Sequence, residues 1–156
     1  MITGIVHINV VCSDLEKSKE FYCDLLGGHM VGGRMWQAES EGVGTGLGLG
    51  ETAEWKAYLI RFSHDKRATV IDLLQWINPP STGKPYEKLN NVGMPRMALG
   101  VDDVDKTYNE LKEKGVKFIS PPQYVDLVPN MPGQGLIRIV TCFDPDGTAI
   151  EFVQNI

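Results

Sequence analysis

The sequence has no cluster of basic residues and no long apolar run. Its 15 lysines and arginines stand against 20 aspartates and glutamates, a net charge of −5 at pH 7, which argues against nucleic acids and anionic membranes as partners. No stretch approaches the ~20 apolar residues that span a membrane, and the first residues, MITGIVH, lack the basic and apolar parts of a signal peptide. We therefore expect a cytoplasmic protein that acts on small molecules.

Cysteine motifs and nucleotide-binding motifs are also missing. Cys12, Cys23 and Cys142 form no CxxC pair, so we expect free thiols rather than a zinc or redox site. No GxGxxG stretch opens a helix after a strand, which argues against a nucleotide-binding loop. The sequence thus predicts no nucleotide cofactor.

An internal repeat is the main feature that the sequence does contain. GTAIEFVQ at 147–154 matches ATVIDLLQ at 68–75 and aligns Glu151 with Asp72, while RMALGVDDVDK at 96–106 matches HINVVCSDLEK at 7–17 and aligns Arg96 with His7. Each copy is typical of a strand, a helix and about three more strands. We therefore predict an α+β fold of two tandem βαβββ modules that form a curved sheet around a cup-shaped cavity. The predicted modules are residues 1–78 and 94–156 of one compact domain, joined by a linker at 79–93.

Local patterns predict where the helices begin. Ser13 with Glu16 forms a capping box at the start of the first helix, and Asp102 is expected to cap the second. Between residues 42 and 50, glycine occupies every second position, which predicts a thin strand or a mobile loop.

The repeat also predicts a site. Matching positions of two equivalent modules meet around a pseudo-twofold axis, so His7 is grouped with Arg96, and Asp72 with Glu151. Their neighbours two residues along each strand are mostly apolar or small. We therefore expect four ionisable groups to converge in one largely apolar cavity, where they must be paired or bind a cation.

These motifs resemble the vicinal oxygen chelate superfamily, which includes glyoxalase I, methylmalonyl-CoA epimerase, extradiol dioxygenases and bleomycin-binding proteins. The resemblance covers nearly the whole chain and is most specific in HINVVCSDLEKSKEFYCDLLG, ALGVDDVDKTYNELKEKGV and FDPDGTAIEFVQ. It implies paired βαβββ modules, frequent homodimers, and metal ligands on the first and last strand of each module. Those positions are here His7, Asp72, Arg96 and Glu151.

Arg96 departs from the family pattern, because a guanidinium stays protonated and cannot ligate a cation. Three hypotheses therefore remain. His7, Asp72 and Glu151 could hold a divalent metal (Mn, Fe, Zn, Ni or Co) while Arg96 binds an anionic substrate group. Without a metal, His7 or a carboxylate could perform acid–base chemistry. In the third hypothesis Arg96 neutralises the acids and the cavity only binds a ligand.

The leading prediction is a glyoxalase- or epimerase-like lyase or isomerase that acts on a small organic acid or carbonyl compound by metal-assisted proton transfer. Glu151 and His7 are its predicted catalytic residues, and Arg96 and Asn9 its predicted substrate-binding residues. The alternatives are a metal-free acid–base enzyme and a metal-free ligand-binding or drug-sequestering protein. Further candidates are Tyr58, Tyr124 and Arg138 as cavity residues and the segment 129–135 as a lid. The three tryptophans could line the cavity or pack in the core, and the core is the default expectation: Trp36, Trp55 and Trp76.

Overall fold

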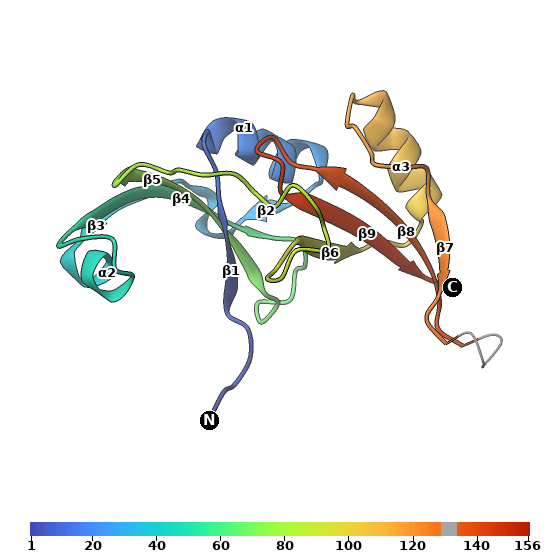
Figure 1. The fold of residues 1–156 in the computed structure, drawn as a ribbon, viewed down its shortest axis with the longest axis horizontal. Coiled ribbons are helices and arrows are strands. Elements are labelled where there is room, and N and C mark those ends of the chain that lie inside the picture. Colours follow the sequence, from blue (N-terminus) through green and yellow to red (C-terminus); the bar gives the residue numbers. More distant parts are fainter. Residues whose placement is uncertain (129–133) are drawn as a thin grey trace. The chain divides into compact units, whose positions relative to one another are not determined.

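The computed structural model describes residues 1–128 and 134–156 and divides the chain into two compact units, Met1–Gly83 and Lys84–Ile156 (Figure 1). Each unit holds one copy of the repeat. The predicted lid lies mostly outside the described residues.

The first unit is a five-stranded sheet with helices attached. It runs through β1 (His7–Val11), α1 (Leu15–Lys19), β2 (His29–Met30), β3 (Trp36–Ser40), α2 (Glu41–Gly46), β4 (Ala53–Arg61) and β5 (Val70–Asn78). Helix α1 continues as a π-helical segment, Glu20–Leu25, and a short 3₁₀ turn, Val31–Gly33, follows β2. The strand order is β1-β5-β4-β2, with β3 also paired to β4. Strands β1 and β5 are parallel, and the other pairs are antiparallel.

The second unit repeats this plan with four strands. Its elements are β6 (Arg96–Gly100), α3 (Val104–Glu113), β7 (Gln123–Asp126), β8 (Leu136–Phe143) and β9 (Ala149–Asn155), and the sheet order is β6-β9-β8-β7. The first and last strands, β6 and β9, are again parallel. The α+β class and the tandem βαβββ modules are therefore confirmed, with the strands of each module in a sheet of their own.

Strand register reproduces the repeat residue by residue. In the first unit Asn9 lies opposite Asp72, and in the second Ala98 lies opposite Glu151. His7 and Arg96 are equivalent in the same way, opposite Val70 and Ala149 respectively. Asp72 and Glu151 thus occupy equivalent positions in the two parallel strand pairs, β1–β5 and β6–β9.

One face of each sheet carries the hydrophobic core. Helix α1 packs on β4 and β5, and α3 packs on β8 and β9. Strand side chains alternate between faces, and those facing the helices are buried: Val10, Ile60, Ile71 and Leu73 in the first unit, and Val140, Cys142, Ile150 and Phe152 in the second. The other face of β1 and β6 is exposed, which leaves it free for chemistry.

The helix starts differ from the sequence prediction by one residue. Asp14 and Asp103, not Ser13 and Asp102, are the N-caps, and their side chains accept from the backbone N–H of Lys17 at 3.2 Å and Lys106 at 2.8 Å. Both predicted caps are wrong, because Asp14 and Asp103 are the extended residues directly before the first helical residue, which is the position an N-cap occupies.

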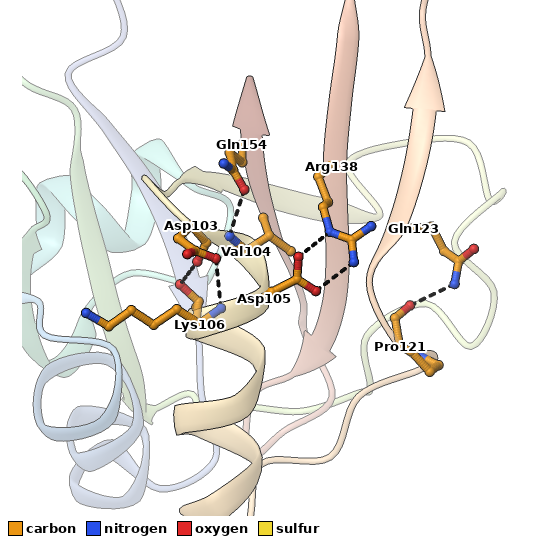
Figure 2. A network of polar contacts seen from close by, with 9 residues as sticks. Asp103, Val104, Asp105, Lys106, Pro121, Gln123, Arg138 and Gln154 are labelled. Carbon is orange, nitrogen blue, oxygen red and sulfur yellow. Dashed lines mark hydrogen bonds and ion pairs between the residues drawn. The ribbon is translucent and has the colours of Figure 1, made fainter. Parts of the chain in front are cut away.

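The repeated glutamine of the last strands also anchors these helix starts. Gln75 Oε1 accepts from Leu15 N at 3.2 Å, and Gln154 Oε1 accepts from Val104 N at 3.0 Å. Figure 2 shows the second of these contacts beside the Asp103 cap. Each glutamine satisfies a helix N–H that has no partner within the helix, and so fixes the helix to the sheet.

The glycine-rich segment is partly helical, so the prediction of a strand or loop at 42–50 is wrong for residues 42–46. Ser40 Oγ accepts from Val43 N at 3.2 Å and caps α2. A Cβ on Gly44 would lie 2.8–2.9 Å from backbone atoms of Thr52 and Ala53. Glycine is therefore required here by a close backbone approach, which a count of alternating glycines does not reveal.

Candidate functional site

The acid of the first unit meets a neutral partner. Asn9 Nδ2 donates to Asp72 Oδ2 at 2.8 Å across the parallel pair β1 and β5. Burial raises the pKa of Asp72 above its ordinary value of 3.8, although the hydrogen bond from Asn9 and the charge of His7 act in the opposite direction. Asp72 is therefore a carboxylate that takes up a proton more readily than an exposed aspartate.

His7 lies on the same exposed face as Asn9, two residues earlier on β1. Its charge acts on Asp72, so the two groups are electrostatically coupled within the first unit. One acid, one amide and one imidazole thus share this part of the sheet. An imidazole and a carboxylate so placed can divide the roles of proton donor and acceptor.

The acid of the second unit meets a cation instead. Arg96 Nε lies 3.0 Å from Glu151 Oε1, across the parallel pair β6 and β9. The Glu151 side chain is only 11% exposed, whereas that of Arg96 is 45% exposed. The guanidinium therefore neutralises a carboxylate that the sheet has largely removed from water.

The predicted site residues thus fall into two groups, one for each unit. His7, Asn9 and Asp72 lie together in the first, and Arg96 and Glu151 lie together in the second. Convergence of both groups in a single cavity stays a prediction.

A divalent metal fits these residues poorly. Among residues 1–128 and 134–156, no three histidine, cysteine, aspartate or glutamate side chains are arranged as a metal-binding group. The first unit contributes two suitable donors, His7 and Asp72. The second contributes Glu151, which already contacts the fixed positive charge of Arg96. A cation bound to this glutamate would be repelled by that charge.

Three predicted cavity residues lie on the helix side of their sheets, so this assignment is wrong. Tyr58 donates to Glu16 of α1 at 2.9 Å. Arg138 donates two hydrogen bonds to Asp105 of α3, from Nε at 2.5 Å and from Nη2 at 2.6 Å, as Figure 2 shows. Tyr124 lies opposite Arg138, and the centroid of its ring is 4.2 Å from the Arg138 guanidinium carbon. These residues fasten helices to strands, because strand alternation places them on the face opposite the acids.

Tryptophan was predicted in the core, but none of the three tryptophans is buried. Trp36 is 41% exposed and stacks under Arg34, whose guanidinium carbon lies 4.4 Å from the ring centroid. Trp55 and Trp76 are half-buried and form an edge-on pair with centroids 5.8 Å apart. Trp76 lies four residues after Asp72 on β5, so this pair lines the face of the sheet that carries the acid.

One residue of this face was missed by sequence reasoning. Arg61 ends β4, two residues after Leu59, which lies opposite Asp72. The available signal was a charged residue in phase with Trp55, Ala57 and Leu59, which give one face of this strand an apolar character. It is weak, because strand phase alone cannot show whether such a residue has a partner.

Comparison with known proteins places the fold among the glyoxalases. The family model described as Glyoxalase/Bleomycin resistance protein/Dioxygenase superfamily matches residues 4–152. A protein named probable lactoylglutathione lyase from Synechocystis sp. is 27% identical over 97% of this chain and 95% of its own length. Another of that name from Vibrio cholerae is 29% identical, over 97% and 90%.

A solved structure gives the same result for the fold. The glyoxalase family protein from Bacillus cereus superposes with a TM-score of 0.77 over 99% of this chain and 95% of its own, at 17% identity.

None of the helices in the described part of the chain has the length and apolar character that a membrane span requires.

Proposed function

Because the chain belongs to the Glyoxalase/Bleomycin resistance protein/Dioxygenase superfamily, we propose that it is a lyase or isomerase that moves a proton on a small carbonyl compound or organic acid. Two full-length relatives with the name probable lactoylglutathione lyase support the class of reaction. The cytoplasmic location and the homodimer predicted from the sequence belong to the same proposal.

The observation that carries the proposal is the environment of Asp72. This carboxylate is half-buried, its pKa is raised, and it accepts from the uncharged amide of Asn9. A general base works best when its pKa lies near the working pH, and burial moves the pKa of Asp72 in that direction.

The proton transfer follows from these positions. Asp72 takes a proton from the carbon next to the substrate carbonyl, and the C–H electron pair forms the C=C bond of an enol. The carbonyl oxygen receives the displaced electron pair and a proton from His7. Asp72 then returns a proton to the carbon while the enol O–H gives its proton back to His7, so the carbonyl re-forms, both side chains regain their starting state, and an isomerisation or an exchange is complete. Asn9 holds the Asp72 carboxylate in place through its hydrogen bond.

Glu151 was the base predicted from the sequence, and its contact with Arg96 makes it a weaker candidate. The Arg96 Nε lies 3.0 Å from Glu151 Oε1, so one oxygen of this carboxylate is already engaged by a fixed cation and is not open to a substrate proton. We therefore assign proton transfer to Asp72 and charge neutralisation to the Arg96–Glu151 pair.

Metal assistance through His7, Asp72 and Glu151 remains the form of the reaction predicted from the sequence. A divalent ion would stabilise charge on the substrate oxygen. The poor fit of the donor set means that no step above depends on it. Arg96→His tests this point, because it removes the fixed charge and adds a fourth possible ligand. A rise in melting temperature with manganese or zinc in this variant, greater than in the parent chain, would support a metal site at these positions.

The main experiment is hydrogen–deuterium exchange at carbon, followed by NMR in D₂O with lactoylglutathione and pyruvate as test compounds. We expect the parent chain to accelerate exchange and Asp72→Asn to lose about 100-fold or more of that rate. Asp24→Asn, an exposed aspartate of the same unit, is the matched control. Full activity in Asp72→Asn would refute the role given to Asp72.

A ligand-binding protein without catalysis is the second candidate. The Arg96–Glu151 ion pair favours this alternative. Arg96 already contacts the carboxylate that would otherwise bind a metal or accept a substrate proton. Tight binding of a small acid with no exchange under any condition would decide for this alternative.

A further inference from the structure

Arg61 lies on the same face of the first sheet as the proposed base. Leu59 lies opposite Asp72 in the β4–β5 pairing, so Arg61, two residues later, projects from the same face. The pairing of Ile60 with Ile71 places Arg61 beside Val70, and Val70 also lies opposite His7. Val70 therefore lies between Arg61 on β4 and His7 on β1. Asp72 lies two residues after Val70 on β5, on the same face.

The Arg61 guanidinium has an unmet hydrogen-bonding group. Its Nε is buried and has no hydrogen-bond partner among the described residues, although the residue as a whole is not fully buried. A buried donor without a partner is rare in native proteins, and more so when it carries a charge. Arg61 thus places a positive charge, and an N–H without a hydrogen-bond partner among the described residues, on the face of the sheet that carries His7 and Asp72.

Three other arginines each contact an acidic side chain, which Arg61 does not do among the described residues. Arg96 contacts Glu151, Arg138 contacts Asp105, and Arg67 contacts Asp65. An acid placed beside Arg61 would satisfy Nε in the same way. A carboxylate is the best match, because its two oxygens fit the planar guanidinium.

The rest of the face indicates what the carboxylate is attached to. Leu59 provides apolar surface directly beside Arg61, and the edge-on pair Trp55 and Trp76 extends the apolar part of the same face further along β4 and β5. A ligand with an acid group at one end and an apolar or aromatic body would satisfy both features.

We propose that Arg61 binds the carboxylate of an organic-acid substrate in the first unit, with the carbonyl next to His7 and Asp72. The substrate class is a 2-oxo acid with an apolar side chain. The catalytic part of this inference rests on the proposed function, whereas the binding part does not.

Two matched ligands separate the carboxylate contact from the rest of the site. Phenylpyruvate carries the acid, the carbonyl and an aromatic body, and phenylacetone replaces the acid by a methyl group. Isothermal titration of the full chain should show that phenylpyruvate binds more tightly than phenylacetone. Arg61→Met should weaken phenylpyruvate binding about tenfold or more and leave phenylacetone unchanged. Arg61→Lys, which keeps the charge but lacks Nε, should give an intermediate loss.

Controls make each outcome decisive. Arg67→Met, at a 92% exposed arginine on the loop after β4, should bind both ligands as the parent does. Melting curves check that Arg61→Met is folded, and Arg61→Lys takes its place if it is not. Equal affinity of parent and Arg61 variants for phenylpyruvate, equal weakening of both ligands, or no binding of phenylpyruvate by the parent would each overturn the inference.

Exchange assays on the same proteins keep the two proposals apart. If Asp72→Asn retains full exchange activity while Arg61→Met loses phenylpyruvate affinity, the proposed function fails and the carboxylate site stands. If Asp72→Asn loses exchange and Arg61→Met binds normally, the reverse holds.

Discussion

In the first unit the acid of the last strand accepts a hydrogen bond from an uncharged amide, whereas in the second unit the equivalent acid contacts a guanidinium. Backbone geometry does not account for this difference, since Asp72 and Glu151 occupy the same register position beside β1 and β6. The side chains on the neighbouring strand differ instead. Asn9 is replaced by Ala98, which cannot donate from its side chain, and His7 by Arg96.

The two units agree where the fold requires it. Asp14 and Asp103 cap equivalent helices, and Gln75 and Gln154 bind the first helical amide of each. Such residues satisfy groups that every copy of the module must satisfy. The exposed sheet face has no such requirement, so one copy can carry acid–base chemistry while the other carries an ion pair.

Removal of the guanidinium should have the largest effect on stability. Arg96→Met leaves the largely buried Glu151 carboxylate without its cation, and we expect a loss of about 2 kcal/mol in the free energy of unfolding. This is below the ~3–5 kcal/mol of fully buried pairs because Arg96 is half exposed to water. Urea denaturation at pH 7 measures the change. Arg67→Met is the surface control, and the double variant Arg96→Met/Glu151→Gln should recover part of the loss. An unchanged midpoint for Arg96→Met would show that the pair contributes nothing.

A smaller and equal effect is expected where the two units agree. Gln75→Ala and Gln154→Ala each remove the acceptor for a helix N–H and should each cost about 1 kcal/mol. Gln75 also donates to Ser13 O at 3.0 Å, so its loss should be slightly greater. The same denaturation experiment serves, with Gln37→Ala at an exposed glutamine as control. Effects that differ several-fold between the units would contradict their structural equivalence.

The smallest expected effect is on stability when each acid is replaced by its amide, and the change should have opposite signs at Asp72 and Glu151. Burial raises the pKa of Asp72 above 3.8, so the folded chain binds this proton more tightly than the unfolded chain. Stability from this group therefore falls as the pH rises through the range between 3.8 and the folded pKa. Asp72→Asn should then be more stable than the parent at pH 7 and similar below pH 3.8. Glu151→Gln, in contrast, loses its ion pair and should be less stable than the parent at pH 7. Denaturation midpoints at both pH values test this, and a loss of stability in Asp72→Asn at pH 7 would contradict it.

The module plan and the pair of equivalent acids could be predicted from the sequence, because both follow from periodicity. Alternation along β1 and β5 put Asn9 and Asp72 in phase, and the repeat aligned Asp72 with Glu151. Periodicity could not decide partners. Tyr58 and Arg138 were assigned to the cavity, yet each meets an acid in the first turn of a helix. The glycine-rich stretch before β4 was also misjudged, since its helix depends on the close approach of Gly44 to the backbone at Thr52.

The amino-acid sequence by itself determined the two βαβββ modules, the family resemblance and the four strand positions with ionisable groups, because hydrophobic alternation and an internal repeat are properties of residue order. Tertiary structure alone decided which charge each acid meets. Arg96 reaches Glu151, and Arg61, on the sheet face that carries Asp72, keeps a buried Nε that has no hydrogen-bond partner in the described part of the chain. The physical reason is that a side chain's partner depends on register between strands that lie far apart in the chain, and that the free energy of a buried charge depends on that partner.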